Sequence, residues 1–200
     1  MAGVEKFVVL GYNATDKESK NLKTMKILKF PNLRQTYEYD CGAQAMQSVL
    51  AYYGMDVPEG IIMQIAETTR GGTNISGLTK VARKYGLKVS VRKMNVDKVK
   101  KYIDRKIPVI LFVQAWPNQS KKVVNWLHEW DSGHYVVAIG YDKDRIYFED
   151  PATFNVAFLT YDELRNRWHD IEHDKKYEHY GMAVYGKEPV FDPEKIVHMD

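Results

Sequence analysis

The chain has 200 residues, which is the length of one domain with a single hydrophobic core. Its 44% hydrophobic and 28% charged residues are ordinary for a globular protein and exclude wholesale disorder. The 29 basic and 26 acidic residues leave a net charge of only +3, so charge does not indicate a nucleic-acid partner.

The chain contains one cysteine, which excludes an intramolecular disulfide and fits a reducing compartment. The longest apolar run, "IPVILFV" at 107–113, is far too short to cross a membrane as a helix. The N-terminus lacks the basic and then apolar pattern of a signal peptide. We therefore expect a cytoplasmic protein without a membrane segment.

The first half of the chain is predicted to be mainly helical. Residues 4–12 have the pattern of an edge strand, and 13–30 are polar and ambiguous. From residue 41 to 54, apolar residues recur at steps of three and four and end at a glycine, which is typical of an amphipathic helix. Residues 58–67 and 76–86 predict two further helices.

The second half is predicted to be rich in strands. Residues 87–94 alternate as a strand does, and 95–106 begin with an asparagine cap and have helical spacing. A helix is expected at 160–168. The remaining runs are β-rich and separated by turn residues, at 108–116, 134–142, 145–150, 155–161 and 181–186. Helices first and antiparallel strands afterwards indicate an α+β fold.

The lone Cys41 stands where the helical pattern begins. Free cysteine is among the most buried residue types, so a small packing residue is the first interpretation. Its place in the first turn of the helix favours the other one, because free N–H groups and the helix dipole stabilise an anion there. Gly42 leaves room beside the sulfur for a carbonyl carbon. Cys41 is therefore a candidate nucleophile.

A thiolate nucleophile needs an imidazole partner and an acceptor that orients it. His134 is the candidate because it opens the best apolar strand of the chain. Asp150 ends the next strand, before a proline that favours extended backbone, and adjacent strands would bring it near His134. His128 lies in a polar and aromatic insertion. Four other histidines lie in charged or terminal surroundings and are expected at the surface: His169, His173, His179 and His198.

The fourth component of such a site is a donor for the oxyanion. Gln35 lies six residues before Cys41, on the segment that enters the helix. Its side-chain amide and the backbone N–H of Cys41 are candidates for binding the developing negative oxygen. A surface glutamine is the alternative interpretation of Gln35 taken alone.

These residues, in this order and context, resemble those of the C39 peptidases. This is a family of papain-like cysteine peptidases that includes the leader-removing domain of bacteriocin exporters. The similar segments are "QTYEYDCGAQAMQSVLAYYG", "GGTNISGLTKVARKYGL" and "IPVILFVQ" through "GHYVVAIGYDKDRIYFEDPA". Together they cover about residues 31–160, and the set is specific although each motif alone is weak.

The resemblance implies a role for each residue: Cys41 as nucleophile, His134 as general base and acid, Asp150 as its orienting partner and Gln35 as oxyanion donor. It also implies a papain-like fold, with a helical half packed on an antiparallel sheet and the cleft between them. We expect a single domain over 1–200, with 1–30 as an extension, 31–160 as the core and 161–200 as the end of the sheet and a tail. No Walker-type phosphate loop is present, so a stand-alone domain is expected.

The loop at 115–133 is an elaboration that carries three of the four tryptophans. We expect it beside the cleft, where it would help to select the substrate. Tyr39, Gly42, Trp116 and Gly133 are the predicted substrate contacts, and packing is the alternative for Tyr39 and Trp116.

Hydrolysis of a peptide bond is the expected activity, with a peptide or protein as substrate. The same acyl-thioenzyme resolved by an amine or thiol would make a transpeptidase or a transferase similar to phytochelatin synthase. A peptide-binding module without catalysis is the third class. His128, Glu129, Asp131 and His134 are candidate zinc ligands, but they lack the His-Glu-x-x-His spacing. We expect no metal, no cofactor and no nucleic-acid partner.

Overall fold

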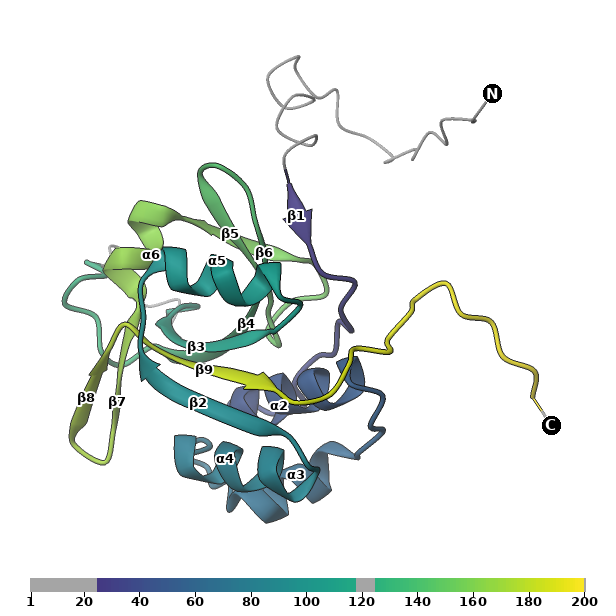
Figure 1. Ribbon diagram of the computed structural model, residues 1–200. Coiled ribbons are helices and arrows are strands. Elements are labelled where there is room, and N and C mark those ends of the chain that lie inside the picture. Colours follow the sequence, from purple (N-terminus) through teal and green to yellow (C-terminus); the bar gives the residue numbers. More distant parts are fainter. Residues whose placement is uncertain (1–24, 118–124, 200) are drawn as a thin grey trace, which may run out of the picture.

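The computed structural model describes residues 25–117 and 125–199. The strand predicted at 4–12 lies outside these residues. Within them the fold is α+β, as predicted: three helices come first, and an antiparallel sheet with two more helices follows (Figure 1). None of the described helices is long and apolar enough to cross a membrane.

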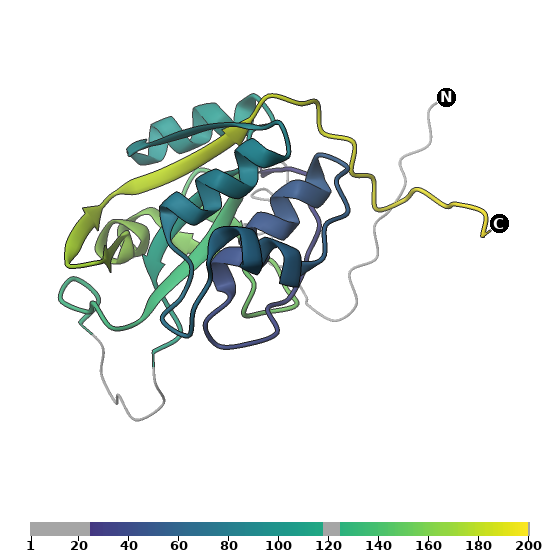
Figure 2. The same ribbon diagram turned by 90° about the horizontal axis from the view of Figure 1, so that it is seen from below.

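The helical half contains α2 (Cys41–Tyr52), α3 (Glu59–Ala66) and α4 (Ile75–Lys84), which confirms the three helices predicted there. These helices pack on one another and on one side of the sheet (Figure 2). Helix α2 is the central one, because ten of its twelve residues are buried. It contacts α3, α4 and strand β4 (Gly133–Tyr141), so it joins the two halves.

The main sheet is antiparallel and has the order β2-β9-β3-β4-β5-β6. Short β1 (Lys26–Ile27) pairs with the end of β4 and adds a seventh strand. The other members are β2 (Lys88–Lys93), β3 (Val109–Gln114), β5 (Arg145–Glu149), β6 (Ala157–Thr160) and β9 (Tyr180–Tyr185). Each of these strands except β1 was predicted, with small differences at the ends.

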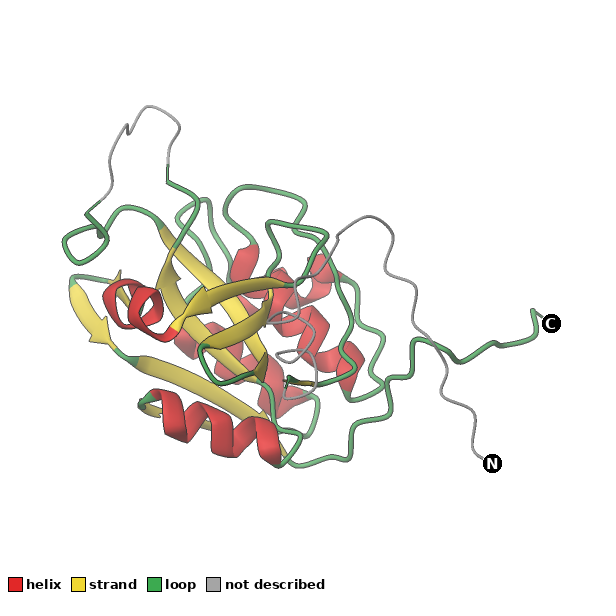
Figure 3. Ribbon diagram, turned by 90° about the horizontal axis from the view of Figure 1, so that it is seen from above, coloured by secondary structure: helices red, strands yellow, loops and turns green. Residues whose placement is uncertain are grey.

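Two helices cover the other side of the sheet. They are α5 (Val96–Asp104), capped by the Asn95 side chain on the Lys98 N–H, and α6 (Tyr161–Arg167), which begins with a capping box on Thr160 (Figure 3). Because helices lie on both faces, every residue of β3 is buried. The core is thus continuous through the sheet, and it fixes the strands that hold the candidate site.

The segment after α6 forms a hairpin that the sequence did not predict. Strands β7 (His169–Glu172) and β8 (Lys175–Glu178) pair only with each other, and β7 also contacts β3 and β4. The expectation that His169 is exposed is wrong. Its side chain is 5% exposed, its Nε2 lies 2.7 Å from the Glu129 carbonyl, and its ring packs on Trp130. Two residues of the 115–133 loop, Glu129 and Trp130, therefore contact this side chain and help to bury it.

Candidate active site

Cys41 is the first residue of α2, and it is only 8% exposed. The preceding Asp40 is fully buried, and its Oδ2 accepts a hydrogen bond from the Tyr37 N–H at 2.8 Å. This contact closes the loop that leads into the helix. The sulfur therefore lies at the end of α2 where backbone N–H groups are free to stabilise a negative charge.

Gly42 allows the first turn of α2 to pack closely on the rest of the molecule. A Cβ there would come within 2.9 Å of the Thr73 Cβ and 3.1 Å of the Tyr135 Cδ2. A side chain would push α2 away from both. The structure thus gives Gly42 a packing role, and its predicted contact with the substrate stays a prediction.

His134 and Asp150 meet across the β4–β5 hairpin, as the sequence predicted. Val137 pairs with Glu149, so Asp150 lies opposite Val136 and diagonally from His134. The His134 Nε2 and the Asp150 Oδ1 are 2.7 Å apart, and both side chains are buried. With Nε2 engaged, Nδ1 is the ring nitrogen left for Cys41.

The electrostatics of this pair favour a charged imidazole. Burial lowers the pKa of His134, but hydrogen bonds and charge interactions with Asp150 and Cys41 outweigh it and raise that pKa to about 10. Burial raises the pKa of Asp150, but its interactions with His134 and its hydrogen bonds from Ala152 and Trp116 bring it below its ordinary value. An imidazolium held between a thiol and a carboxylate is the arrangement that makes a thiolate available.

Trp116 lies on the second oxygen of Asp150. Its indole N–H donates to the Asp150 Oδ2 at 2.9 Å, while its side chain remains more than half exposed. The backbone at Trp116 has φ 51°, in the left-handed region that is costly for a bulky residue. The hydrogen bond fixes the carboxylate that is bonded to His134, a contact that the sequence did not predict.

Gln35 is tied to the same corner of the molecule. Its backbone N–H donates to the Pro151 carbonyl at 3.0 Å, and its side-chain Nε2 donates to the Tyr37 carbonyl at 2.7 Å. One of the two Nε2 hydrogens is engaged in this way and the other is available. The Oε1 is buried, with no hydrogen-bond partner among the described residues.

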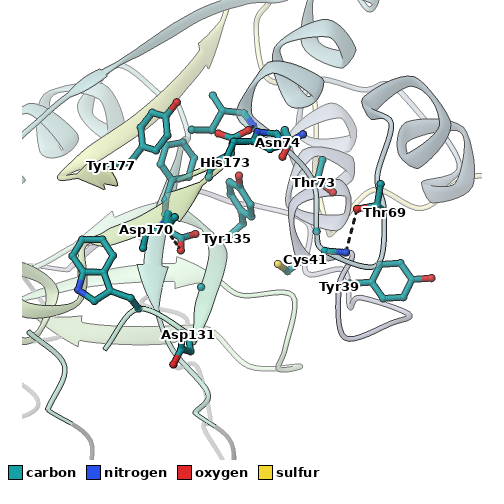
Figure 4. Close-up of a pocket in the computed structure, with 18 of the residues that line it drawn as sticks. Tyr39, Cys41, Thr69, Thr73, Asn74, Asp131, Tyr135, Asp170, His173 and Tyr177 are labelled. Atoms are coloured by element: carbon teal, nitrogen blue, oxygen red, sulfur yellow. Dashed lines mark hydrogen bonds between the residues drawn. The ribbon is translucent and has the colours of Figure 1, made fainter. Parts of the chain in front are cut away.

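A cavity of about 570 Å³ opens beside Cys41 (Figure 4). Of the predicted substrate contacts, Tyr39 and Gly133 line this cavity. Gly42 and Trp116 do not. Trp116 instead lines a separate groove of about 540 Å³ on the far side of Asp150. The substrate roles of all four residues stay predictions.

Two carboxyl groups near the site, the buried Glu149 and the half-buried Asp170, were missed from the sequence. Glu149 accepts hydrogen bonds from the Ser48 hydroxyl at 2.9 Å and the Leu33 N–H at 3.4 Å, and burial raises its pKa to about 8. Asp170, on β7, lines the cavity next to Gly133, and burial raises its pKa to about 6. The sequence signal that could have placed Asp170 is an alternating strand pattern at 169–172. The charged residues of this segment made it look like an exposed loop.

Within residues 25–117 and 125–199, no cluster of three or more histidine, cysteine, aspartate or glutamate side chains has the geometry to hold a metal ion. Of the candidate zinc ligands, His134 is bonded to Asp150, and the Glu129 Oε1 accepts from the backbone N–H of Asp131.

A helix that begins with a thiol, packed on an antiparallel sheet that carries a bonded histidine and aspartate, is the architecture of the papain-like cysteine peptidases. The sequence matches the Peptidase C39 family over residues 29–172. The chain belongs to that family.

The relatives agree with this assignment. The chain is 36% identical over 63 residues to the pediocin PA-1 transport/processing ATP-binding protein PedD of Pediococcus acidilactici, which is 32% of this chain and 9% of that protein. A putative C39-like peptidase from Bacillus anthracis has a similar structure, with a TM-score of 0.61 at 17% identity, covering 82% of this chain and 98% of that one. A double glycine motif protease from an AMS/PCAT transporter, in complex with the leader peptide, has a TM-score of 0.58 at 23% identity, covering 79% and 92%. The last two similarities concern the fold.

Proposed function

We propose that the protein is a cysteine peptidase that hydrolyses a peptide bond through an acyl-thioenzyme. The observation that carries the proposal is the position of His134, which is hydrogen-bonded to Asp150 at 2.7 Å and has its pKa raised by both Asp150 and Cys41. Membership of the Peptidase C39 family supports peptidase chemistry. The leader peptide held by one similar structure supports a peptide as the substrate.

In the first half of the reaction, the Cys41 thiolate adds to the carbonyl carbon of the scissile bond. The oxyanion accepts hydrogen bonds from the backbone N–H of Cys41 and from the second Nε2 hydrogen of Gln35. As the C–N bond breaks, His134 gives the proton on its Nδ1 to the departing amine. A thioester between Cys41 and the acyl half of the substrate remains.

In the second half, neutral His134 takes a proton from a water molecule, and the resulting hydroxide adds to the thioester. Collapse of this intermediate breaks the C–S bond and releases the acid, which restores the thiolate and the imidazolium. Asp150 remains ionised throughout and keeps Nδ1 directed at the sulfur. Trp116 and the Ala152 N–H hold Asp150 in turn.

Digestion of a proteome-derived peptide library in ¹⁸O-labelled water tests this function. We expect new C-termini that carry one ¹⁸O atom with the wild type and none with Cys41→Ala. The same termini with both proteins, or none with either, would contradict the proposal. New C-termini joined to an added amine such as glycinamide would identify acyl transfer instead.

A further inference from the structure

Among the charged residues that line the cavity beside Cys41, the acidic ones are in the majority. The lining includes four residues with a carboxyl group, one arginine and one histidine. The carboxyl groups belong to Glu38, Asp131, Asp170 and Glu172, and the basic groups to Arg70 and His173. Acidic residues beside a nucleophile favour a positively charged ligand, because charge in a cavity attracts the opposite charge.

Asp170 has the most informative position of these groups. Its carboxyl group lies against Gly133, the residue before His134, where a Cβ would come within 2.5 Å of Oδ1. The absence of a side chain at Gly133 therefore leaves room for this carboxyl group in the wall of the cavity. Asp170 and Cys41 lie on opposite walls of the cavity, with Tyr135 between them (Figure 4).

The position of the carboxyl group is fixed. Its Oδ1 accepts hydrogen bonds from the Ile171 N–H at 2.9 Å and from the Gln114 Nε2 at 3.3 Å. Gln114 is itself fully buried and accepts from the Ser132 N–H. A carboxylate held in this way is ready for a ligand.

The Asp170 carboxyl group has no ion-pair partner within the described part of the chain. Neither Asp170 nor Glu172 forms an ion pair with a lysine or arginine of the described residues. Burial raises the pKa of Glu172 above its ordinary value, against the Ile75 N–H and the charges of His173 and Lys175, which act to lower it. Lys176 places its ammonium over the ring of Trp130 instead. Burial, then Glu172, Asp170 and Cys41, raise the pKa of Tyr135 well above its ordinary value, so groups on β7 and on α2 act on one hydroxyl.

The remaining walls suit the stem of a long basic side chain. Aromatic rings line the cavity, namely Tyr39, Phe112, Trp130, Tyr135 and Tyr177. Aromatic faces pack on methylene groups and attract a cation at the end of them. A carboxylate at one wall and rings at the others select lysine or arginine over a short or acidic residue.

We propose that Asp170, supported by Glu172, makes this cavity a pocket for a lysine or arginine side chain of the substrate next to the scissile bond. The inference rests on the proposed function, since it concerns the peptide that Cys41 attacks. The hairpin β7–β8 is then the part of the fold that selects the substrate.

Because Cys41 is the only cysteine, charged thiol reagents report on the potential at the sulfur. The rates of reaction are measured with cationic 2-(trimethylammonium)ethyl methanethiosulfonate and with anionic 2-sulfonatoethyl methanethiosulfonate. In each case a disulfide forms with the sulfur and methanesulfinate leaves. The ratio of the two rates cancels the fraction of thiolate, so it does not depend on how far Cys41 is activated.

We expect a cation-to-anion ratio above that of a cysteine-containing peptide. Asp170→Asn keeps the shape and should lower the ratio about threefold or more, the size expected of one charge several ångströms away. Glu172→Gln should lower it less. Asp174→Asn is the matched control, since it removes a charge from the exposed turn of the same hairpin, outside the cavity. A ratio equal to that of the peptide, or unchanged in Asp170→Asn, would overturn the proposal.

A binding experiment gives a second measurement that needs no reactive thiol. Octapeptide pools with one position fixed as lysine, norleucine or glutamate are passed over immobilised Cys41→Ala protein. We expect preferential retention of a lysine pool, lost when Asp170→Asn is added. Equal retention of the glutamate pools, or no retention of any pool, would contradict the pocket. Cation-selective binding by a protein that cleaves nothing would reject the proposed function and leave the pocket standing.

Discussion

The segment from residue 35 to residue 150 and the β7–β8 hairpin contribute different things to one cavity. The first supplies the thiol, the imidazole, the aspartate and the candidate oxyanion donor, all held by the central helix and the β4–β5 hairpin. The second supplies Asp170 and Glu172, two carboxyl groups that line the same cavity and accept hydrogen bonds from Gln114, Ile171 and Ile75. Under our two proposals, the first set of residues performs the chemistry and the second set selects the peptide.

The largest expected effect is the loss of peptide cleavage when a residue of the first set is replaced, compared with one of the second. His134→Ala should lower the rate of peptide cleavage by about 10²–10⁴-fold, the usual contribution of a general acid–base group. Asp170→Asn should leave the cleavage of a peptide without basic residues within about twofold of wild type. The measurement is kcat/KM for peptides found in the library digestion. A large loss in Asp170→Asn on such neutral peptides would break the separation.

Trp116 belongs to the first set and contacts it through Asp150, whose Oδ2 accepts the indole N–H. Trp116→Phe keeps an aromatic ring but removes the donor to Asp150, so kcat should fall about tenfold, the value of one hydrogen bond to a charged group. KM should change little. A rise in KM with kcat unchanged would instead support the predicted role as a substrate contact. Trp126→Phe, on the same loop, serves as the control for a lost indole.

The buried carboxyl group of Glu149, next to Asp150 in the chain, is expected to make the stability of the fold depend on pH. Its pKa, raised to about 8, means that the folded protein binds a proton more tightly than the unfolded chain, so this group destabilises the fold as pH rises from about 4.5 to 8. Glu149→Gln removes the titration while its oxygen still accepts from Ser48. We measure the thermal unfolding midpoint of the variant minus that of the wild type at pH 5 and at pH 9. This difference should be at least about 3 °C larger at pH 9 than at pH 5. A difference that does not change with pH would contradict the burial of a neutral acid.

The pairing of His134 with Asp150 could be predicted because it depends only on a hairpin between two apolar strands with clear turns. The helix that begins at Cys41 could be predicted in the same way, from its spacing of apolar residues. Both are local patterns. The roles of these residues were implied by the resemblance to a family and not by the spacing itself.

The hairpin could not be predicted because its stability comes from contacts far away in the sequence. Residues 169–178 are rich in charge, and what fixes β7 is the Glu129 carbonyl on His169 and the amide of Gln114 on Asp170. The packing around Gly42 has the same character, since Thr73 and Tyr135 come from distant segments. Tertiary contacts decide such positions, and no local pattern contains them.

The central claim is that Cys41 and His134 form an ion pair, and the rate of alkylation of Cys41 by iodoacetamide against pH tests it most directly. Because the pKa of His134 is raised to about 10, its positive charge persists through neutrality and should keep the thiolate reactive well below pH 8. We predict a fast rate from about pH 6 upward in the wild type that is lost in His134→Ala. A slow rate that rises only near the ordinary thiol pKa of about 8.5, with no change in the variant, would contradict the account.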